Sequence, residues 1–579
     1  MEDYRTRHMR RARERRRKQM ITLAVLVAVV IIVAVSAIML KKMGPNKEPA
    51  DLNMHYKLGS DEVMLLLENK EAEERGRLID GQVYVDYETV INHLNKRFYW
   101  DSNENLILYT TPTEIIKAEV GSKNYYVVNS KETLSHTIVK TEGDKAYLSL
   151  EFVKKFSNIE YQVYQDPNRV TIQYQWGNEF LYSKVKKATQ LRTEGNVKGA
   201  IIKELAAGDV VRYLDGNVEG KFAEIMTEDG LIGYVNLKHL EDSYYDSKTS
   251  DYEEPKYKSI SKDETINLVW HQVTNQTAND NLLNMLSGTK GVTTVSPTWY
   301  SVNGSDGSIS SLASQRYVDR AHNLGIEVWA LVNDFDKDVD MMKVLSTTSS
   351  REKLSNELLA EAIKYGFDGI NVDFENISLE MGRHYIQFLR ELSVKCRNNG
   401  IVLSIDNYVP SPYSEYYDRE EQGIIADYVI IMAYDEHHGT SEVSGSVASQ
   451  PFLEKAIEDS LTMVPADKLI MGIPFYTRLW QEKAKKDGTV KVSSKVYNMT
   501  NAQKLMKDMK VDLIWDEDCS QYYGEYTTSE GTFKMWLEDE KSIEAKMKAI
   551  YNNKLAGVAE WKLGLESDGV WNVIQKYVN

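Results

Sequence analysis

The second half of the chain alternates short apolar runs with helical stretches, and this pattern constrains the fold more than any other feature. Eight runs typical of buried strands follow one another from residue 261 onward. The predicted strands are Ile266–Val273, Val292–Pro297, Ile326–Val332, Gly369–Phe374, Ile401–Asp406, Tyr428–Met432, Leu469–Pro474 and Gly557–Trp561. Strands that alternate with helices in this way predict a (β/α)8 TIM barrel over residues 261–579. The long gap before the last strand predicts a small α+β insertion at about residues 477–541.

A row of polar side chains interrupts the fourth predicted strand. Because side chains alternate along a strand, Asn371, Asp373 and Glu375 share one face, and the apolar residues between them share the other. Glu375 falls at the C-terminal end of the strand, where active sites of this fold lie. Carboxyl groups this close cannot both ionise easily, so one keeps a proton, as a general acid must. The alternative is a buried polar network that only orders the barrel interior.

The segment Asp368–Glu375 resembles the signature strand of glycoside hydrolase family 18, the chitinase-like enzymes, whose pattern is Asp-Gly-x-Asp/Asn-x-Asp-x-Glu. Asn371 stands where the family more often has Asp, which leaves open how far the charge of Asp373 is relayed down the barrel. Three further segments resemble the family's motifs on the sixth, seventh and eighth strands. These segments are Ile431–Asp435, Gly472–Arg478 and Gly557–Trp561.

The resemblance implies a substrate-assisted retaining mechanism, in which the 2-acetamido oxygen of the sugar attacks C1. Glu375 would be the general acid and then the base, Asp373 would orient the acetamido group, and Tyr434 would donate a hydrogen bond to its carbonyl. Trp561 would form the apolar floor beneath the sugar ring. The remaining candidates for substrate binding are Asn371, Met432, Asp435 and Arg478. Tyr434 and Trp561 could instead be core residues, and Asp435 and Arg478 could pair with each other.

The loop after the sixth strand combines a possible ligand cluster with a further resemblance. Asp435-Glu436-His437-His438 is one short cluster without distant ligands, so the sequence predicts a loop rather than a metal site, and no cofactor is expected. Together with Gly445–Ser449, this stretch resembles the spore-germination and cortex-lytic branch of the family. The resemblance to that branch implies that peptidoglycan is the favoured substrate, with chitin oligosaccharides or another N-acetylhexosamine polymer as alternatives. Cys396 and Cys519 are interpreted as two inert thiols.

The N-terminus combines a basic segment with a long uncharged run. Residues 1–43 carry eleven Lys and Arg against three Asp and Glu, and Met20–Leu40 has no charge. At about 1.5 Å per residue this run can cross a bilayer core of roughly 30 Å. Basic residues before the span predict a cytoplasmic tail (1–19), a transmembrane helix (20–40) and an extracellular remainder. The alternative is a cleaved signal peptide. The remainder is strongly acidic, which argues against nucleic-acid binding.

The region between the apolar run and the barrel predicts three further parts. A tether over 41–80 is expected to pass into a short helix near Asp61–Glu74. Residues 81–178 show a strand–helix–strand pattern twice and loosely resemble the amine-oxidase N-terminal-like stalk domain. Residues 183–241 have short β runs between tight turns and resemble bacterial SH3 domains, which contact cell-wall peptides. A polar linker covers 242–260.

Together these patterns predict a membrane-anchored extracellular glycosidase that cleaves glycans containing N-acetylglucosamine. A catalytically silent carbohydrate-binding protein on the same scaffold is one alternative, because a fold alone does not secure an activity. A wall-adhesion protein whose function lies in residues 82–241 is the other.

Overall fold

The computed structural model describes residues 2–68, 70–128 and 130–578, and these form two compact units. The first unit contains the chain up to Lys96 together with Lys140–Glu253. The second contains Arg97–Val139 together with Glu254 and all that follows. Residues 97–139, the middle of the predicted stalk domain, therefore belong with the barrel, although the sequence pattern places them with residues 81–96 and 140–178.

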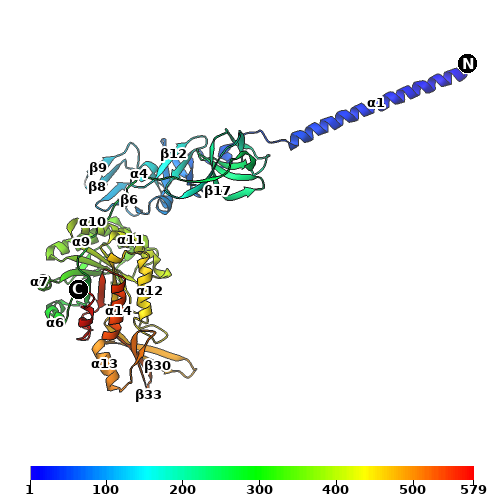
Figure 1. Ribbon diagram of the computed structural model, residues 1–579. Coiled ribbons are helices and arrows are strands. Elements are labelled where there is room, and N and C mark those ends of the chain that lie inside the picture. The colour runs from blue at the N-terminus through cyan, green and yellow to red at the C-terminus, as the bar shows by residue number, and fades with distance from the viewer. Residues whose placement is uncertain (1, 69, 129, 579) are drawn as a thin grey trace. The chain divides into compact units, whose positions relative to one another are not determined.

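The second unit is built around a closed barrel of eight parallel strands, as the apolar runs predict (Figure 1). Each strand pairs with its neighbours in parallel, and pairing between the second and third strands completes the ring. The strands are β21 (Ile266–His271), β22 (Thr294–Pro297), β25 (Glu327–Asn333), β26 (Gly369–Asp373), β27 (Val402–Tyr408), β28 (Tyr428–Met432), β29 (Leu469–Pro474) and β35 (Gly557–Trp561).

Helices surround the strands, and two apolar layers result from the alternation of side chains. The larger layer lies between strands and helices, while a smaller one, which includes Trp270, Trp329 and Tyr428, fills the barrel interior. The surrounding helices include α7 (Gln315–His322), α8 (Met341–Ser346), α9 (Thr348–Tyr365), α10 (Gly382–Asn399), α11 (Arg419–Ile425), α12 (Gln450–Leu461), α14 (Glu540–Asn552) and α15 (Val570–Ile574). Helices α9 and α10 both end at a glycine in the left-handed region, Gly366 and Gly400, a common helix terminus.

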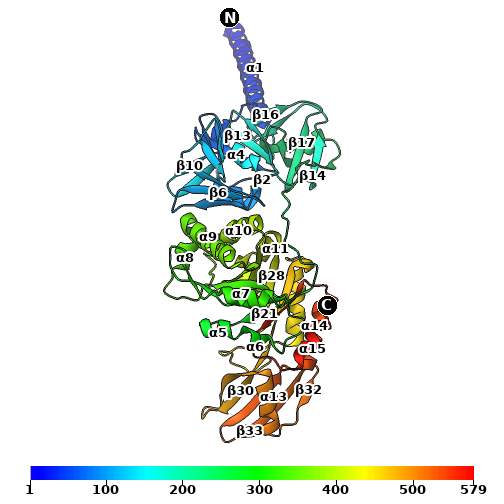
Figure 2. The same cartoon turned by 90° about the vertical axis from the view of Figure 1, so that its left-hand side faces the viewer.

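The predicted insertion is present as a separate α+β lobe after β29. It consists of one helix and a five-stranded antiparallel sheet, and it lies on the side of the barrel away from α9 and α10 (Figure 2). The elements are β30 (Tyr476–Ala484), β31 (Val490–Asn498), α13 (Met499–Asp508), β32 (Ile514–Asp516), β33 (Gln521–Thr528) and β34 (Gly531–Leu537). The lobe has its own small core, which includes Met506 and Met535.

A second small sheet packs on the helices of the barrel. Its strands are β5 (Phe98–Asp101), β6 (Leu106–Thr110), β7 (Ile115–Glu119), β8 (Asn124–Val127) and β9 (Ser130–Thr133). The Asp101 carboxylate accepts a hydrogen bond from the Thr348 backbone N–H (2.6 Å), and the Tyr99 hydroxyl lies 2.6 Å from Nδ1 of His384. These buried polar contacts explain why the sheet belongs to the barrel unit.

The first unit contains a mixed sheet, and part of the segment predicted as a tether belongs to it. Residues near Asp61–Glu74 form strands and not a helix, and all five residues Val63–Leu67 are buried between β13 and β3. A short apolar run does not by itself distinguish a strand from a helix, and here the pairing with both neighbours decides it. The strands are β1 (Glu62–Leu67), β2 (Lys70–Glu71), β3 (Gly76–Ile79), β4 (Gln82–Asp86), β10 (Val139–Glu142), β11 (Lys145–Ser149), β12 (Glu160–Tyr164) and β13 (Arg169–Gln173), with helix α4 at Leu150–Lys155.

A seven-stranded antiparallel sheet completes the first unit. Its strands are β14 (Glu179–Lys184), β15 (Thr189–Arg192), β16 (Ile201–Leu205), β17 (Val210–Glu219), β18 (Phe222–Thr227), β19 (Ile232–Asn236) and β20 (Tyr244–Ser247). Strand β20 lies in the segment predicted as a linker. The two sheets share one core, in which Met64 and Leu66 pack with Leu191 and Val235. Their mutual position inside the unit is therefore set by packing.

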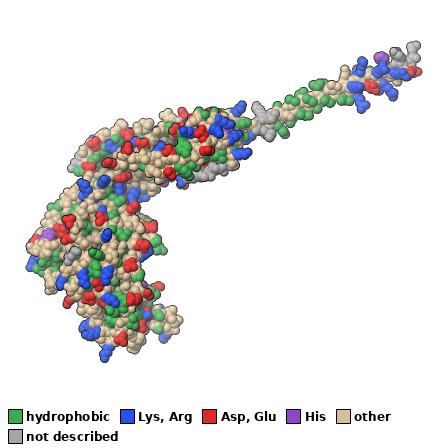
Figure 3. All heavy atoms as spheres, viewed as in Figure 1, with side chains coloured by type: hydrophobic (Ala, Val, Ile, Leu, Met, Phe, Trp, Pro, Cys, Tyr) green, Lys and Arg blue, Asp and Glu red, His purple; other side chains and the backbone are tan. Residues whose placement is uncertain are grey.

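The N-terminal helix α1 (Glu2–Met43) carries the apolar run without a break. Its basic end is followed by a band of apolar side chains (Figure 3). By length and composition α1 is long and apolar enough to cross a membrane, a test that a signal sequence also passes.

Candidate active site

The polar row of the fourth strand points into the barrel, as the alternation predicts. Ile370, Val372 and Phe374 belong to the outer apolar layer. Asn371 lies on the opposite face, where its amide oxygen accepts hydrogen bonds from Nε1 of Trp270 (3.1 Å) and Oγ of Ser296 (2.9 Å). Glu375 follows β26 at the C-terminal end of the barrel.

A second polar row runs beside the first on β27. Asn371 is in register with Ser404, so the inward residues of β27 that follow, Asp406 and Tyr408, lie next to Asp373 and Glu375. Two hydrogen bonds connect the rows. Nδ2 of Asn371 donates to Oδ1 of Asp406 (2.8 Å), and the Tyr408 hydroxyl donates to Oε2 of Glu375 (2.5 Å). This second row was not among the residues predicted from the sequence.

Glu375 is held in place through its backbone by an aspartate that the sequence analysis also missed. Asp334, directly after β25, accepts hydrogen bonds from the backbone N–H groups of Glu375 (3.0 Å) and Asn376 (2.9 Å). Burial raises the pKa of Glu375, the hydrogen bond from Tyr408 opposes the rise, and the charge of Asp334 adds to it. A carboxyl group with a raised pKa stays protonated closer to neutral pH, which suits a general acid.

Asp373 and Asp406 form a buried pair of carboxyl groups beneath Glu375. Burial raises the pKa of Asp373 well above its ordinary value, and the charge of Asp406 is the next largest cause. Burial also raises the pKa of Asp406, to about 8. One oxygen of each carboxyl group, Oδ1 of Asp373 and Oδ2 of Asp406, is buried without a hydrogen-bond partner in the described part of the chain.

Three aromatic side chains lie together beside the polar row, where Trp270 donates to Asn371. Trp561 ends β35, and its ring lies 5.9 Å from that of Trp270. The Tyr434 ring meets Trp270 edge-on at 6.5 Å. Burial raises the pKa of Tyr434 well above its ordinary value, so the phenol remains a neutral hydrogen-bond donor, and Asp373 and Glu375 are among the charges that act on it. The structure therefore brings Tyr434 close to both carboxyl groups.

The remaining predicted residues lie at the rim or below the site. Oδ1 of Asp435 accepts a hydrogen bond from the Tyr476 hydroxyl (2.7 Å) and lies 3.6 Å from Nη2 of Arg478, so these two side chains form an ion pair. Met432 belongs to the inner apolar cluster. Asn371 is fully buried and its amide is hydrogen-bonded to protein partners, so its role in substrate binding stays a prediction.

The loop after β28 is held by contacts within the protein. The Glu436 carboxylate accepts the Ser449 backbone N–H (2.8 Å), and Nδ1 of His437 lies 2.9 Å from the Ser446 carbonyl oxygen. Throughout residues 2–68, 70–128 and 130–578, no group of three or more His, Cys, Asp and Glu is placed to hold a metal ion. Neither Cys396 nor Cys519 is in a disulfide, and burial raises the pKa of both thiols.

Over the barrel, the sequence of this chain is similar to those of glycosylases. Residues 267–566 match the family Glycosyl hydrolases family 18, and residues 67–174 match the Copper amine oxidase N-terminal domain, the relationship that the repeated pattern indicates. The Uncharacterized glycosylase YvbX of Bacillus subtilis is 28% identical over 285 residues, which are 47% of this chain and 80% of that protein. The Cortical fragment-lytic enzyme of the same organism is 26% identical over 243 residues, which are 41% of this chain and 56% of that enzyme.

A solved structure supports the fold. The spore cortex-lytic enzyme SleL of Bacillus cereus superimposes with a TM-score of 0.50 at 18% identity, over 65% of this chain and 90% of that one. The barrel, the inward acids at its C-terminal end and the related glycosylases define the chain as a glycosidase. Because the matched segment covers more than half of its length, the chain belongs to glycosyl hydrolases family 18.

Proposed function

We propose that the chain is a membrane-anchored extracellular enzyme that hydrolyses glycans containing N-acetylglucosamine, with peptidoglycan as its substrate. The observation that carries the proposal is the position of Glu375, a carboxyl group with a raised pKa above a buried carboxyl pair and close to Tyr434. Peptidoglycan is favoured over chitin because relatives of this chain include cortical fragment-lytic enzymes.

The geometry supports a substrate-assisted retaining mechanism, an exception to the scheme with an enzyme nucleophile. Glu375 gives its proton to the glycosidic oxygen as the bond from that oxygen to C1 breaks. The acetamido oxygen of the same sugar forms a bond to C1, while Asp373 accepts the acetamido N–H and the Tyr434 hydroxyl donates to the acetamido oxygen. A water molecule then attacks C1, its proton returns to Glu375, and the acetamido group is released.

The apolar floor and the rim give the remaining residues their roles. Trp561 would lie beneath the sugar ring, where an aromatic face contacts the apolar C–H groups of the sugar. Asp435 and Arg478, which face each other at the rim, would contact the sugar hydroxyls as a pair. Met432 would close the apolar wall next to Trp270.

Helix α1 supports the membrane anchor of this proposal. Its apolar band is long enough to span a bilayer, and the basic residues before it favour a cytoplasmic N-terminus. The barrel would then lie outside the membrane, where its polymeric substrate is found. An antibody against an epitope at either end, applied to intact and to permeabilised cells, tests this topology.

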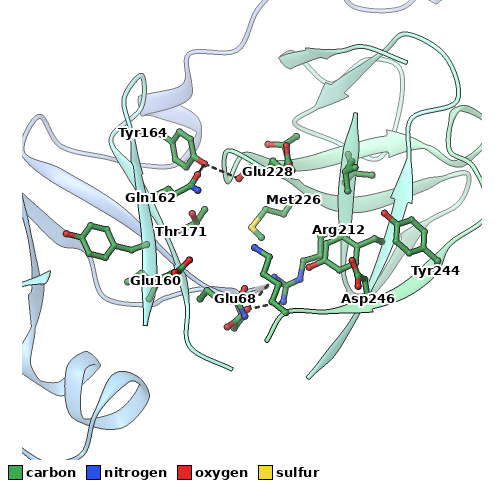
Figure 4. Close-up of a pocket in the computed structure, with 18 of the residues that line it drawn as sticks. Glu68, Glu160, Gln162, Tyr164, Thr171, Arg212, Met226, Glu228, Tyr244 and Asp246 are labelled. Carbon is green, nitrogen blue, oxygen red and sulfur yellow. Dashed lines mark hydrogen bonds and ion pairs between the residues drawn. The ribbon is translucent and has the colours of Figure 1, made fainter. Parts of the chain in front are cut away.

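The first unit offers a groove for the cell-wall contact that an SH3-like domain would make. A cavity of about 680 Å³ lies between β12–β13 and the seven-stranded sheet (Figure 4). One wall is a row of cross-strand neighbours from four strands: Tyr244, Tyr182, Arg212 and Met226. The salt bridge between Arg169 and Asp229 (2.9 Å) connects the two sheets.

Charges of both signs lie along this groove, among them Lys154, Lys248, Glu160 and Glu228. They suit a peptide that carries both amines and carboxylates, so we include wall peptides among the partners proposed for this groove, which residues 183–241 line together with β12, β13 and β20. A double substitution, Lys154→Glu with Lys248→Glu, is expected to weaken sedimentation of the chain with purified cell walls. The control is Lys221→Glu, an exposed lysine that does not line the groove. Equal binding to walls stripped of their peptides would contradict the peptide contact.

The enzymatic proposal is tested with the full chain in detergent. Wild type is expected to release reducing ends from peptidoglycan, and Glu375→Gln is expected to lower the rate about 10²- to 10⁴-fold, the usual contribution of a general acid. Mass spectrometry of the products identifies the bond cut and the sugar at the new end. Binding without turnover by wild type would support the silent carbohydrate-binding alternative. Wall binding that needs only the first unit would support the adhesion alternative.

A further inference from the structure

The departure of this chain from the usual family pattern has a structural counterpart on the next strand. Position 371 is Asn where the family more often has Asp, and the orientation of its amide is fixed. The oxygen of Asn371 accepts from Trp270, whose indole N–H can only donate, so the amide nitrogen must face Asp406. Position 371 on β26 therefore lacks a carboxyl group, but the Asp406 carboxyl group on β27 lies within hydrogen-bond distance of the Asn371 side chain.

The surroundings of Asp406 contain acids and phenols. Asp406 is 2% exposed, and Asn371 below it is fully buried. The charges of Asp334 after β25 and Glu375 after β26 raise the pKa of Asp373, and that of Glu375 also raises the pKa of Asp406. The charge of one or both of these buried aspartates in turn raises the pKa of Tyr408 of β27, Tyr434 after β28 and Tyr385 of α10. Neighbouring carboxyl groups of this kind cannot all ionise together. The cluster therefore holds fewer charges than carboxyl groups.

We propose that Asp406 is a positioning residue that shares one proton with Asp373, and that it takes the place of the carboxyl group that the family more often carries at position 371. The inference rests on the proposed function, because it assigns Asp406 a part in that reaction. Asn371 then has a purpose of its own, since its N–H donor stabilises Asp406 when Asp406 is charged.

The shared proton would move once in each catalytic cycle. At rest it lies between Asp373 and Asp406, consistent with the pKa of about 8 to which burial and the Glu375 charge raise Asp406. When Glu375 has given its own proton to the leaving oxygen, Asp373 keeps the shared proton and can bridge it to the new Glu375 carboxylate. Asp406 is left as the carboxylate, and the cluster holds one proton fewer until the attacking water returns a proton to Glu375. Two adjacent carboxylates are thereby avoided.

The first test is Asp406→Asn in the full chain in detergent. With its largest neighbouring charge removed, the pKa of Asp373 falls, so Asp373 loses its proton at lower pH. We expect kcat at neutral pH to fall roughly 10- to 100-fold with KM changed by less than about threefold, because Asp406 is buried beneath the substrate site. The alkaline limb of the kcat profile should move to lower pH. Ser404→Ala, a buried hydroxyl of the same strand, is the matched control.

The second test exchanges the two side chains in one variant, Asn371→Asp with Asp406→Asn. The amide and the carboxyl group still face each other, and Trp270 and Ser296 still donate to position 371. We expect this double variant to recover most of the kcat that Asp406→Asn loses and to restore the alkaline limb. A folded double variant that is no more active than Asp406→Asn would overturn the proposal, as would an Asp406→Asn enzyme with unchanged kcat and pH profile.

An infrared titration separates this inference from the proposed function because it needs no turnover. The C=O stretch of the protonated Asp373–Asp406 pair is expected in the wild-type chain at pH 7 beside that of other buried acids such as Glu560, and the contribution of the pair should decrease as the pH rises through about 8. Relative to wild type, Asp406→Asn should lose one such band at pH 7, and the exchanged double variant should regain it. An inactive wild-type chain with these bands would refute the proposed function alone. A band unchanged by Asp406→Asn would refute the shared proton.

Discussion

Substitution of Tyr408 by Phe removes one hydroxyl group and one hydrogen bond to Glu375 (2.5 Å). This bond stabilises the charged form of Glu375 and holds its pKa down against the effect of burial. A hydrogen bond to a charged group contributes about 1.5–3 kcal/mol, and one pKa unit corresponds to about 1.4 kcal/mol. The loss would raise the pKa of Glu375 by about 1–2 units. Because Tyr408 is 42% exposed, water can replace part of the bond, and about one unit is the expected shift.

The pH dependence of kcat/KM measures this shift, because it reports the pKa of the acid in the free enzyme. A general acid with a higher pKa stays protonated to higher pH, so the alkaline limb of Tyr408→Phe should move upward by about one unit. A fluorogenic chitooligosaccharide serves as the substrate. Tyr413→Phe is the matched control, since Tyr413 follows the same strand and is 89% exposed. A limb that stays in place or moves to lower pH would refute the role of the Tyr408 hydroxyl.

Three further substitutions test the packing and chemistry around the site. Arg351→Met should destabilise the barrel unit by about 3–5 kcal/mol in calorimetric unfolding, because it leaves the buried Glu391 carboxylate without its cation. Trp561→Ala should lower kcat/KM about 30- to 150-fold, from roughly 2–3 kcal/mol of lost apolar contact with the sugar. Cys519→Ala should keep full activity, since burial and Asp516 raise the pKa of this thiol to about 12, and an inactive variant would reopen thiol chemistry.

The barrel could be predicted from the sequence because its strands are short, apolar and regularly spaced. Runs such as Tyr428–Met432 and Leu469–Pro474 coincide with the observed strands residue for residue. The polar row of β26 could also be predicted, because its outward residues Ile370, Val372 and Phe374 are all apolar and alternate with the polar ones. Contrast between the two faces of a strand is what the pattern depends on.

The row on β27 could not be predicted in the same way because that contrast is lost. Asn407 points outward between Asp406 and Tyr408, and its amide exchanges hydrogen bonds with the side chain of Gln422 on α11 (2.7 and 3.2 Å). Asp406, Asn407 and Tyr408 are therefore all polar, and the alternation between inward and outward side chains is not visible in the sequence. The signal that could have revealed them is Ser404, a polar residue two positions earlier in an otherwise apolar strand. No such signal marks Asp334, because it lies after the end of β25 and its carboxylate binds backbone N–H groups, whose position the sequence does not indicate.

The division of the stalk region depends on contacts that no local pattern encodes. Residues 97–139 repeat the same strand motifs as their neighbours, yet Arg97 pairs with Glu421 (2.9 Å) and Tyr99 accepts a hydrogen bond from Arg351 (3.2 Å). Both partners lie more than 250 residues further along the chain, where the sequence shows only charged positions on helices. A fragment cut at residue 261 would leave Arg351 and Glu421 without these partners. The compact unit that contains the barrel therefore begins within the stalk, and we expect a fragment that lacks residues 97–139 to be less stable than one that includes them.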